Sequence, residues 1–265
     1  MFPTVLVTGA STGIGAVYAD RFAKRGHDLV LVARNHDRLQ AVAGRLRNEH
    51  GVAVDLIQAD ITDERDLQQV EARLRDDTRI GILVNNAGTT AAGGFVEQSA
   101  TAITHVVTLN ALAVIRLAAA VSPRFVAAGA GAIINIGSIV GLVPEYGSVV
   151  YGATKAFVLY LSQALHLQLG PKGVYVQAVL PAAVRTEIWE HASKNVDELP
   201  AVMEVAELID AALVGFDRRE AVTIPPLPDE SQWLAFDAAR QAMIPSFNQV
   251  NAASRYHAAR PTRAA

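Results

Sequence analysis

The stretch V-L-V-T-G-A-S-T-G-I-G, residues Val5 to Gly15, joins a short apolar run to a glycine-rich turn. A helical pattern begins directly after it. In a strand–turn–helix unit the free N–H groups of the first helical turn and the helix dipole both face the turn, where they bind anions. A plain tight turn is the alternative, because the spacing departs from the common G-x-G-x-x-G pattern. We favour a pyrophosphate site, formed by the loop residues Gly9, Ser11, Thr12, Gly13, Ile14 and Gly15.

Apolar runs and helical patterns alternate along most of the 265 residues. Apolar runs that are continuous, without a polar residue at every second position, are typical of strands buried on both faces. We predict strands at 5–7, 29–33, 54–57, 82–84, 132–136, 174–180 and 221–224, and helices at 14–25, 37–49, 63–75, 101–127, 151–169, 204–218 and 231–243. Such alternation predicts an α/β fold with a parallel sheet and helices on both faces. We expect one domain over residues 1–250 and a flexible tail over 251–265.

Composition excludes several classes of function. The formal net charge is -3 and the Lys and Arg residues are scattered, so no basic stripe is available for nucleic acid. Cysteine is absent, which excludes disulfides and thiolate ligands, and we expect no metal site. No signal peptide is recognised and the lack of cysteine fits a reducing compartment, so we expect a cytoplasmic protein. The run between Arg124 and Glu145 is uncharged, but glycines interrupt it, so we expect a buried strand and no membrane span.

The segment Y-G-A-T-K places Tyr151 and Lys155 four residues apart, on one face of a predicted helix. A free tyrosine has a pKa near 10, so only about one in a thousand is ionised at neutral pH. A neighbouring ammonium favours the phenolate and is expected to lower that pKa toward the working range. Two amphipathic side chains on a surface helix are the alternative explanation of the pair.

Four motifs in this order resemble the short-chain dehydrogenase/reductase family: T-G-A-S-T-G-I-G, N-N-A-G at residues 85–88, Ser138, and Y-G-A-T-K. The resemblance covers residues 4–224. It implies a Rossmann-type doubly wound sheet of about seven strands that binds NAD or NADP. It also implies hydride transfer between nicotinamide and a substrate carbon, in which Tyr151 handles the proton and Ser138 holds the oxygen. Lys155 would contact the nicotinamide ribose, and Asn110 would hold a water behind the lysine. Taken singly, Ser138 could be a turn residue and Asn110 a buried amide.

The end of the second predicted strand selects the dinucleotide. An acidic residue there would bind the ribose hydroxyls of NAD, whereas this chain has Ala33 and Arg34. A guanidinium can clamp the 2'-phosphate, so we predict NADP, with NAD as the other possibility and a merely solvated Arg34 as the alternative. The resemblance further implies that Asp60 meets the adenine, although it can equally cap a helix. It also implies contacts with the adenosine side by Asn86, Ala87 and Gly88.

One motif departs from the family pattern. After the sixth predicted strand the family has Pro-Gly and then a threonine, whereas this chain reads P-A-A-V-R-T. Pro181 and Thr186 match, but Ala182 replaces the glycine, so the turn must either avoid positive φ or carry strain. The resemblance implies coenzyme contacts by Pro181, Val184 and Thr186.

The predicted function is NADP-dependent oxidoreduction of a ketone or aldehyde and an alcohol. A lid over residues 187–203 and apolar neighbours such as Phe95, Tyr146 and Val149 suggest a hydrophobic substrate, although Trp189 and Met203 can equally pack the lid on the core. The alternative function is a non-catalytic dinucleotide-binding sensor or interaction protein. The resemblance also suggests a homodimer or homotetramer. The physiological substrate, the reaction direction and the stereochemistry are not determined by the sequence.

Overall fold

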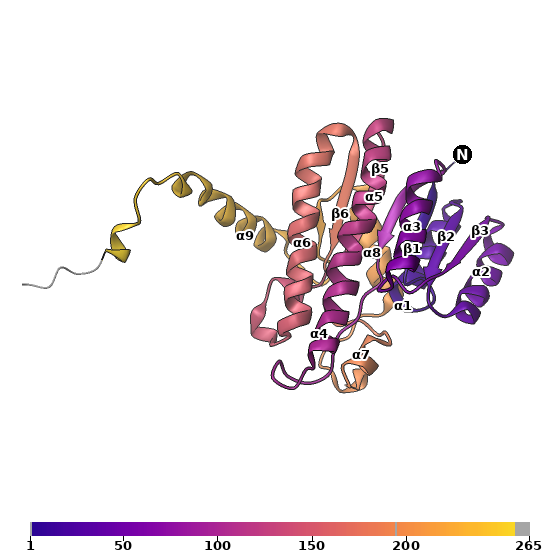
Figure 1. The fold of residues 1–265 in the computed structure, drawn as a ribbon, viewed down its shortest axis with the longest axis horizontal. Helices are drawn as coiled ribbons and strands as arrows, with labels where there is room; N and C mark the ends of the chain where they lie inside the picture. Colours follow the sequence, from indigo (N-terminus) through magenta and orange to yellow (C-terminus); the bar gives the residue numbers. More distant parts are fainter. Residues whose placement is uncertain (1, 194, 258–265) are drawn as a thin grey trace, which may run out of the picture. The chain divides into compact units, whose positions relative to one another are not determined.

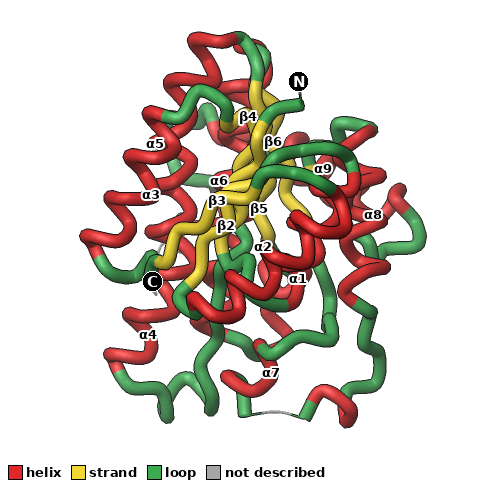
Figure 2. The backbone as a smooth tube through the Cα atoms, turned by 90° about the vertical axis from the view of Figure 1, so that its right-hand side faces the viewer, coloured by secondary structure: helices red, strands yellow, loops and turns green. Residues whose placement is uncertain are grey.

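Seven parallel strands form one sheet, in the order β3-β2-β1-β4-β5-β6-β7, in the computed structural model, which describes residues 2–193 and 195–257 (Figure 2). The strands are β1 (Thr4–Thr8), β2 (Leu29–Ala33), β3 (Val54–Gln58), β4 (Ile80–Asn85), β5 (Gly131–Ile136), β6 (Val174–Val179) and β7 (Val222–Thr223). From β1 the chain adds β2 and β3 on one side, and then adds β4 and the later strands on the other side of β1. In a parallel sheet this reversal opens a crevice at the carboxyl ends of the strands, where ligands bind. The predicted fold class is confirmed.

Helices cover both faces of the sheet. One face carries α1 (Gly13–Lys24), α2 (His36–His50) and α8 (Val205–Asp217). The other carries α3 (Glu64–Asp76), α5 (Ala113–Ala128) and α6 (Val149–Leu169). Each face has its own apolar core, because strands buried on both sides alternate their side chains between two layers of helices. The short helices α4 (Ala100–Val107) and α7 (Ile188–His191) lie together at one end of the sheet in both views (Figures 1 and 2).

The predicted helix over residues 101–127 is interrupted. A π-helical turn, Thr108–Leu112, separates α4 from α5. Such a turn inserts one residue into the helical repeat and is often found at functional sites. Here it contains Asn110, whose side chain is buried. By length and composition the run Ala100–Ala128 could cross a membrane, but α5 buries its apolar face against the sheet, as a core helix does.

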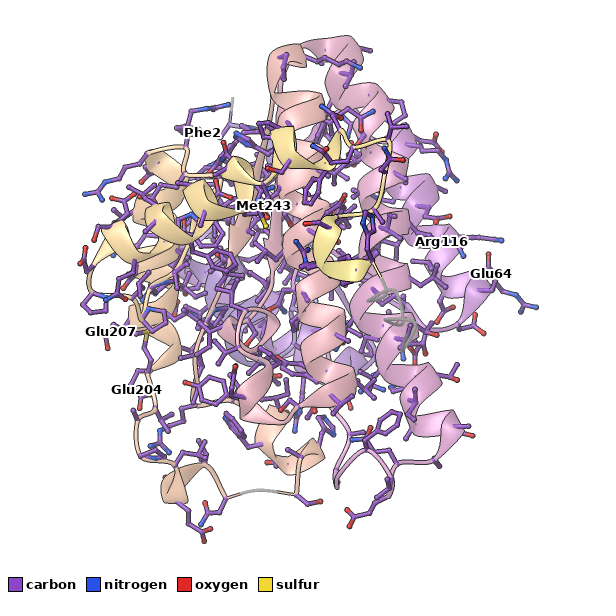
Figure 3. The ribbon with its side chains drawn as sticks, turned by 90° about the vertical axis from the view of Figure 1, so that its left-hand side faces the viewer. Phe2, Glu64, Arg116, Glu204, Glu207 and Met243 are labelled. Atoms are coloured by element: carbon purple, nitrogen blue, oxygen red, sulfur yellow. The ribbon has the colours of Figure 1, made fainter. Side chains whose placement is uncertain are left out.

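A charged cluster joins two neighbouring helices, α3 and α5, on one face of the sheet. Arg116 of α5 donates hydrogen bonds to Glu64 and Glu71 of α3, each at 3.0 Å, and the Arg116 and Glu64 side chains lie beside each other in Figure 3. Glu71 is buried, so its charge requires this partner. The cluster fixes α3 against α5 and therefore supports the strands beneath them.

The chain divides into two units, residues 1–226 and 227–265. The first unit contains every predicted site residue. The second contains α9 (Glu230–Ala242) and the 3-10 turns Ile244–Phe247 and Ser254–Tyr256. We placed the domain end at residue 250, whereas the larger unit ends at Pro226, inside the P-P-L-P run that stops the last strand. Of the predicted tail, residues 258–265 lie outside the described residues.

Candidate active site

The glycine loop between β1 and α1 approaches other backbone too closely for side chains. Gly9 and Gly13 have φ angles of +64° and +51°, in the left-handed region that glycine occupies without strain. A Cβ on Gly15 would lie 2.3 Å from the Gly9 carbonyl oxygen. Thr12 stands at the N-cap of α1 but makes no side-chain capping hydrogen bond, so the first amides of the helix remain free for a ligand. Ser11 lies in the same loop, and Ile14 is in the first turn of α1.

The end of β4 is tied to this loop. The Asn86 side-chain amide donates to the carbonyl oxygens of Thr8 at 2.8 Å and Gly9 at 3.2 Å. In return, the Thr8 hydroxyl accepts from the backbone amides of Asn86 and Ala87 at 3.0 and 3.1 Å. The Asn86 side chain thus supports the glycine turn. Gly88 lies next to the predicted catalytic groups, since a Cβ there would be 3.6 Å from Lys155 Nζ.

Arg34 stands exposed at the end of β2, with its Nη1 3.9 Å from Asp60 Oδ2. The Asp60 carboxylate accepts from the Thr62 amide at 3.0 Å and from the Thr62 hydroxyl at 2.7 Å. Burial would raise the pKa of Asp60, but these hydrogen bonds and the Arg34 charge outweigh it and hold the pKa below its ordinary value. Asp63, and not Asp60, is the N-cap of α3, so Asp60 orders the loop before the helix.

Three side chains from two elements meet beyond the end of β5. Ser138 follows this strand, and its hydroxyl donates to the Pro181 carbonyl oxygen at 3.2 Å. Tyr151 and Lys155 share one face of α6, with Lys155 Nζ 5.5 Å from the centre of the tyrosine ring. Lys155 is buried, and its Nζ donates to the Ile136 carbonyl oxygen at 2.8 Å. The Ser138 side chain lies near enough to the Tyr151 phenol to offset part of the rise in its pKa, so the three predicted groups are next to one another.

Burial controls the proton affinities of this pair. It raises the pKa of Tyr151 to about 12, partly offset by the Ser138 side chain, and it lowers the pKa of Lys155 to about 8. The Lys155 ammonium and the positive nicotinamide of an oxidised coenzyme are together expected to lower the tyrosine pKa, but in the protein alone this pKa is raised. The reason is that desolvation disfavours both charged forms, the phenolate and the ammonium. Tyr151 is therefore a neutral phenol at pH 7 and suits proton donation.

Asn110 connects the π turn to the catalytic helix. Its Oδ1 accepts from the Thr89 amide at 2.9 Å, and its Nδ2 donates to the Thr89 carbonyl oxygen at 2.8 Å and to Thr154 Oγ1 at 3.1 Å. The Thr154 hydroxyl donates in turn to the Tyr151 carbonyl oxygen at 2.8 Å. Both polar atoms of the Asn110 side chain are thus hydrogen-bonded to protein groups. Thr89 and Thr154 were missed from the sequence, although Thr154 lies inside Y-G-A-T-K.

The segment after β6 closes the site on the side of the glycine loop. Ala182 does not have positive φ, because Ser193 and Arg219 are the non-glycine residues with that geometry in the part of the chain that the structure describes. The departure from Pro-Gly therefore carries no such strain. Thr186 lies close to Gly13, and the Val184 carbonyl oxygen accepts from Trp189 Nε1 at 2.8 Å. A cavity of about 260 Å³ is lined by Thr12, Gly13, Arg185, Thr186, Glu187 and Glu190.

The model of the family described as short chain dehydrogenase matches residues 3–197. The chain belongs to the short-chain dehydrogenase family. A solved short-chain dehydrogenase from Sphingobium yanoikuyae in complex with NADPH is 64% identical, with a TM-score of 0.95, over 97% of this chain and 100% of that one. The bulky-bulky ketone specific alcohol dehydrogenase from Comamonas testosteroni is 57% identical, with a TM-score of 0.90, over 96% and 98% of the two chains.

A more distant member of the family is the very-long-chain 3-oxoacyl-CoA reductase of Bos taurus. It is 38% identical over 187 residues, which are 69% of this chain and 60% of the relative. The chain therefore spans less than two thirds of the length of that short-chain dehydrogenase relative. The two solved relatives, in contrast, are matched over almost their whole chains.

Proposed function

We propose that this short-chain dehydrogenase is an NADP-dependent oxidoreductase that interconverts a ketone or aldehyde and an alcohol. The observation that carries the proposal is the meeting of Ser138, Tyr151 and Lys155 beside the glycine loop. The loop fits a dinucleotide, because Gly15 leaves no room for a Cβ and the α1 N-terminus is uncapped over a cavity. When bound, the nicotinamide supplies or accepts the hydride.

Each side chain has a definite task in carbonyl reduction. The neutral Tyr151 phenol donates its proton to the carbonyl oxygen, and the Ser138 hydroxyl donates a hydrogen bond to the same oxygen. Lys155 holds positive charge next to the phenol, which stabilises the phenolate that proton donation leaves behind. Asn110 and Thr154 keep the helix that carries Tyr151 in register with the π turn. In alcohol oxidation the same groups act in reverse.

Preference for NADP is supported by Arg34. This side chain is exposed, and its nearest acidic group, Asp60, is already bonded to Thr62. A 2'-phosphate would therefore meet an available guanidinium. The Sphingobium yanoikuyae relative was solved with NADPH, which agrees with this assignment.

Replacing Arg34 tests the coenzyme preference. In Arg34→Asp we expect the ratio of NADH to NADPH dissociation constants to fall by about 10- to 100-fold, because a charged hydrogen bond is lost and repulsion is added. Arg34→Ala should give an intermediate shift. Titration by nicotinamide fluorescence measures both constants. An unchanged ratio in both variants would show that Arg34 does not read the phosphate.

We further propose a bulky hydrophobic carbonyl substrate. Tyr146 and Val149, which lie between Ser138 and Tyr151 in the chain, are more than half exposed, at 61% and 55%. Phe95, in the loop that follows Gly88, is 55% exposed as well. Exposed aromatic and aliphatic side chains next to a reactive centre suit a substrate with apolar groups on both sides of its carbonyl. The name of the Comamonas testosteroni relative supports this class.

A ketone panel tests the substrate proposal. With NADPH, kcat/KM for ketones that carry aryl or long alkyl groups should exceed that for small polar sugars at least about tenfold, since burying a few methylene groups contributes more than 1.4 kcal/mol. Initial rates of NADPH oxidation provide the measurement. If the sugars react faster, the hydrophobic-substrate proposal fails while the oxidoreductase assignment stands.

A non-catalytic sensor explains the site less well. A protein that only bound the dinucleotide would gain nothing from the buried amine of Lys155, whose pKa is lowered to about 8 by burial. Perturbed ionisable groups of this kind concentrate at catalytic sites.

Assembly as a homodimer or homotetramer remains a prediction, supported by exposed apolar residues along α4 to α6, namely Val107, Leu112, Ile115, Phe157, Tyr160 and Leu167.

A further inference from the structure

Hydrogen bonds join the two ends of the predicted lid, residues 187–203. The Met203 amide donates to the Ala183 carbonyl oxygen at 2.9 Å, and the Arg185 amide donates to the Met203 carbonyl oxygen at 3.1 Å. The Arg185 guanidinium also binds Asp197 at 2.6 Å and Glu204 at 3.0 Å. The two ends of the lid are therefore joined, and its position depends on what its first residues contact.

One ion pair connects the lid to the helices of the dinucleotide-binding half. Arg38 Nη1 donates to both carboxylate oxygens of Glu187, at 2.9 and 2.8 Å. Among the lid residues that the structure describes, 187–193 and 195–203, only Glu187 forms a hydrogen bond with a residue that precedes β6.

The ion pair lies at the edge of the predicted coenzyme groove. Glu187 lines the cavity at the N-terminus of α1, together with Thr12 and Gly13, where the pyrophosphate is expected. Arg38 lies in the first turn of α2, four residues after Arg34 at the end of β2. A dinucleotide that binds both Arg34 and the glycine loop would therefore lie beside the two residues that form this ion pair.

We propose that Arg38 and Glu187 form a clasp that closes over the bound dinucleotide and slows its release. This inference rests on the proposed dinucleotide binding and adds two positioning residues to it. The guanidinium of Arg38 is already neutralised by a carboxylate, whereas that of Arg34 is 3.9 Å from its nearest one. Arg34 therefore binds the 2'-phosphate of NADPH, and Arg38 holds the lid through Glu187. The clasp acts equally on NADPH and NADH, because it does not depend on the 2'-phosphate.

Dissociation rates test the clasp. Each purified variant is loaded with NADPH or NADH, mixed rapidly with excess NADP, and followed by nicotinamide fluorescence. Arg38→Gln and Glu187→Gln should each raise both dissociation rates about two- to fivefold, the range expected for a half-exposed ion pair. The charge-exchanged double variant, Arg38→Glu with Glu187→Arg, should return the rates toward those of the wild type. For NADH, which lacks the 2'-phosphate that Arg34 would bind, salt should speed release more from the wild type than from the single variants.

A matched ion pair provides the control. Arg25, directly after α1, binds Asp217 of α8 through two hydrogen bonds of 2.8 and 2.9 Å, with similar exposure, on a part of the surface with no predicted coenzyme contact. Asp217→Asn should leave both dissociation rates unchanged. A general loss of rigidity would instead alter release in this variant too.

Three results would overturn the clasp. Unchanged dissociation rates of NADPH and NADH in both Arg38→Gln and Glu187→Gln would refute the clasp. A faster release of NADPH but not NADH in Arg38→Gln, with slower NADPH release in Glu187→Gln, would make Arg38 a phosphate ligand instead. A wild-type protein that binds neither dinucleotide would refute the proposed function together with the clasp, so the two failures are distinguishable.

Discussion

In Tyr151→Phe, kcat for ketone reduction should fall at least about 10³-fold, while the NADPH dissociation constant changes less than about threefold. The phenol is the proton donor, and positioned general acids contribute about 10²- to 10⁴-fold to a rate. Phenylalanine keeps the ring, and so preserves the packing around α6. Burial raises the pKa of Tyr151 to about 12, so the wild-type group is protonated at every pH used in ordinary assays. Steady-state kinetics and fluorescence titration provide the two measurements.

Ser138→Ala is the companion variant. It removes one hydrogen-bond donor to the carbonyl oxygen and should lower kcat about 10²- to 10³-fold. Because both side chains act on the same oxygen, the double variant should lose much less than the product of the two single effects. A Tyr151→Phe enzyme that retains a tenth of the wild-type kcat would refute the assignment of Tyr151.

Lys155→Met should inactivate the enzyme and stabilise it at pH 7. Loss of the charge beside Tyr151 should lower kcat by at least about two orders of magnitude. Burial lowers the pKa of Lys155 from 10.5 to about 8, so holding the ammonium inside the folded protein costs free energy. Methionine has a similar length and no charge. After allowance for the lost hydrogen bond to Ile136, we expect the free energy of unfolding to rise by roughly 1–2 kcal/mol.

The pH dependence of this stabilisation has a definite sign. The unfolded chain binds the lysine proton more tightly than the folded protein does, so the wild type gains stability as pH rises from about 8 toward 10.5. Below pH 8 the whole penalty applies. Urea unfolding of both proteins should therefore show the advantage of Lys155→Met at pH 7 and its decline by pH 10. A variant less stable than the wild type at pH 7 would contradict this account.

Several features of the site follow from local sequence. The glycine loop needs Gly9 and Gly15 because no other residue fits the φ angle or the contact that these positions have. Tyr151 and Lys155 share a face because their spacing is one helical turn. These relations depend on neighbours within a few residues, so the pattern alone indicates them.

The π turn at Asn110 could not be predicted in this way. The segment T-L-N-A-L is compatible with an ordinary helix, and the extra residue is accommodated because the buried amide finds partners on Thr89 and Thr154. Those partners come from a loop 21 residues earlier and a helix 44 residues later. A buried amide without them would be costly, so the tertiary structure determines the local helix type.

The sequence by itself determined the α/β fold and the glycine turn, because helical and strand periodicity and short-range sterics depend on near neighbours. The proposed catalytic residues follow from the resemblance of four motifs to the short-chain dehydrogenase family. Only the tertiary structure decided three further properties. The pKa of Tyr151 is raised and not lowered, since burial outweighs the opposing effect of Ser138. Ala182 carries no positive φ, and the lid is held by Arg38 and Glu187, which are 149 residues apart in the chain. Burial and long-range ion pairs exist only after distant segments meet, and no local pattern records them.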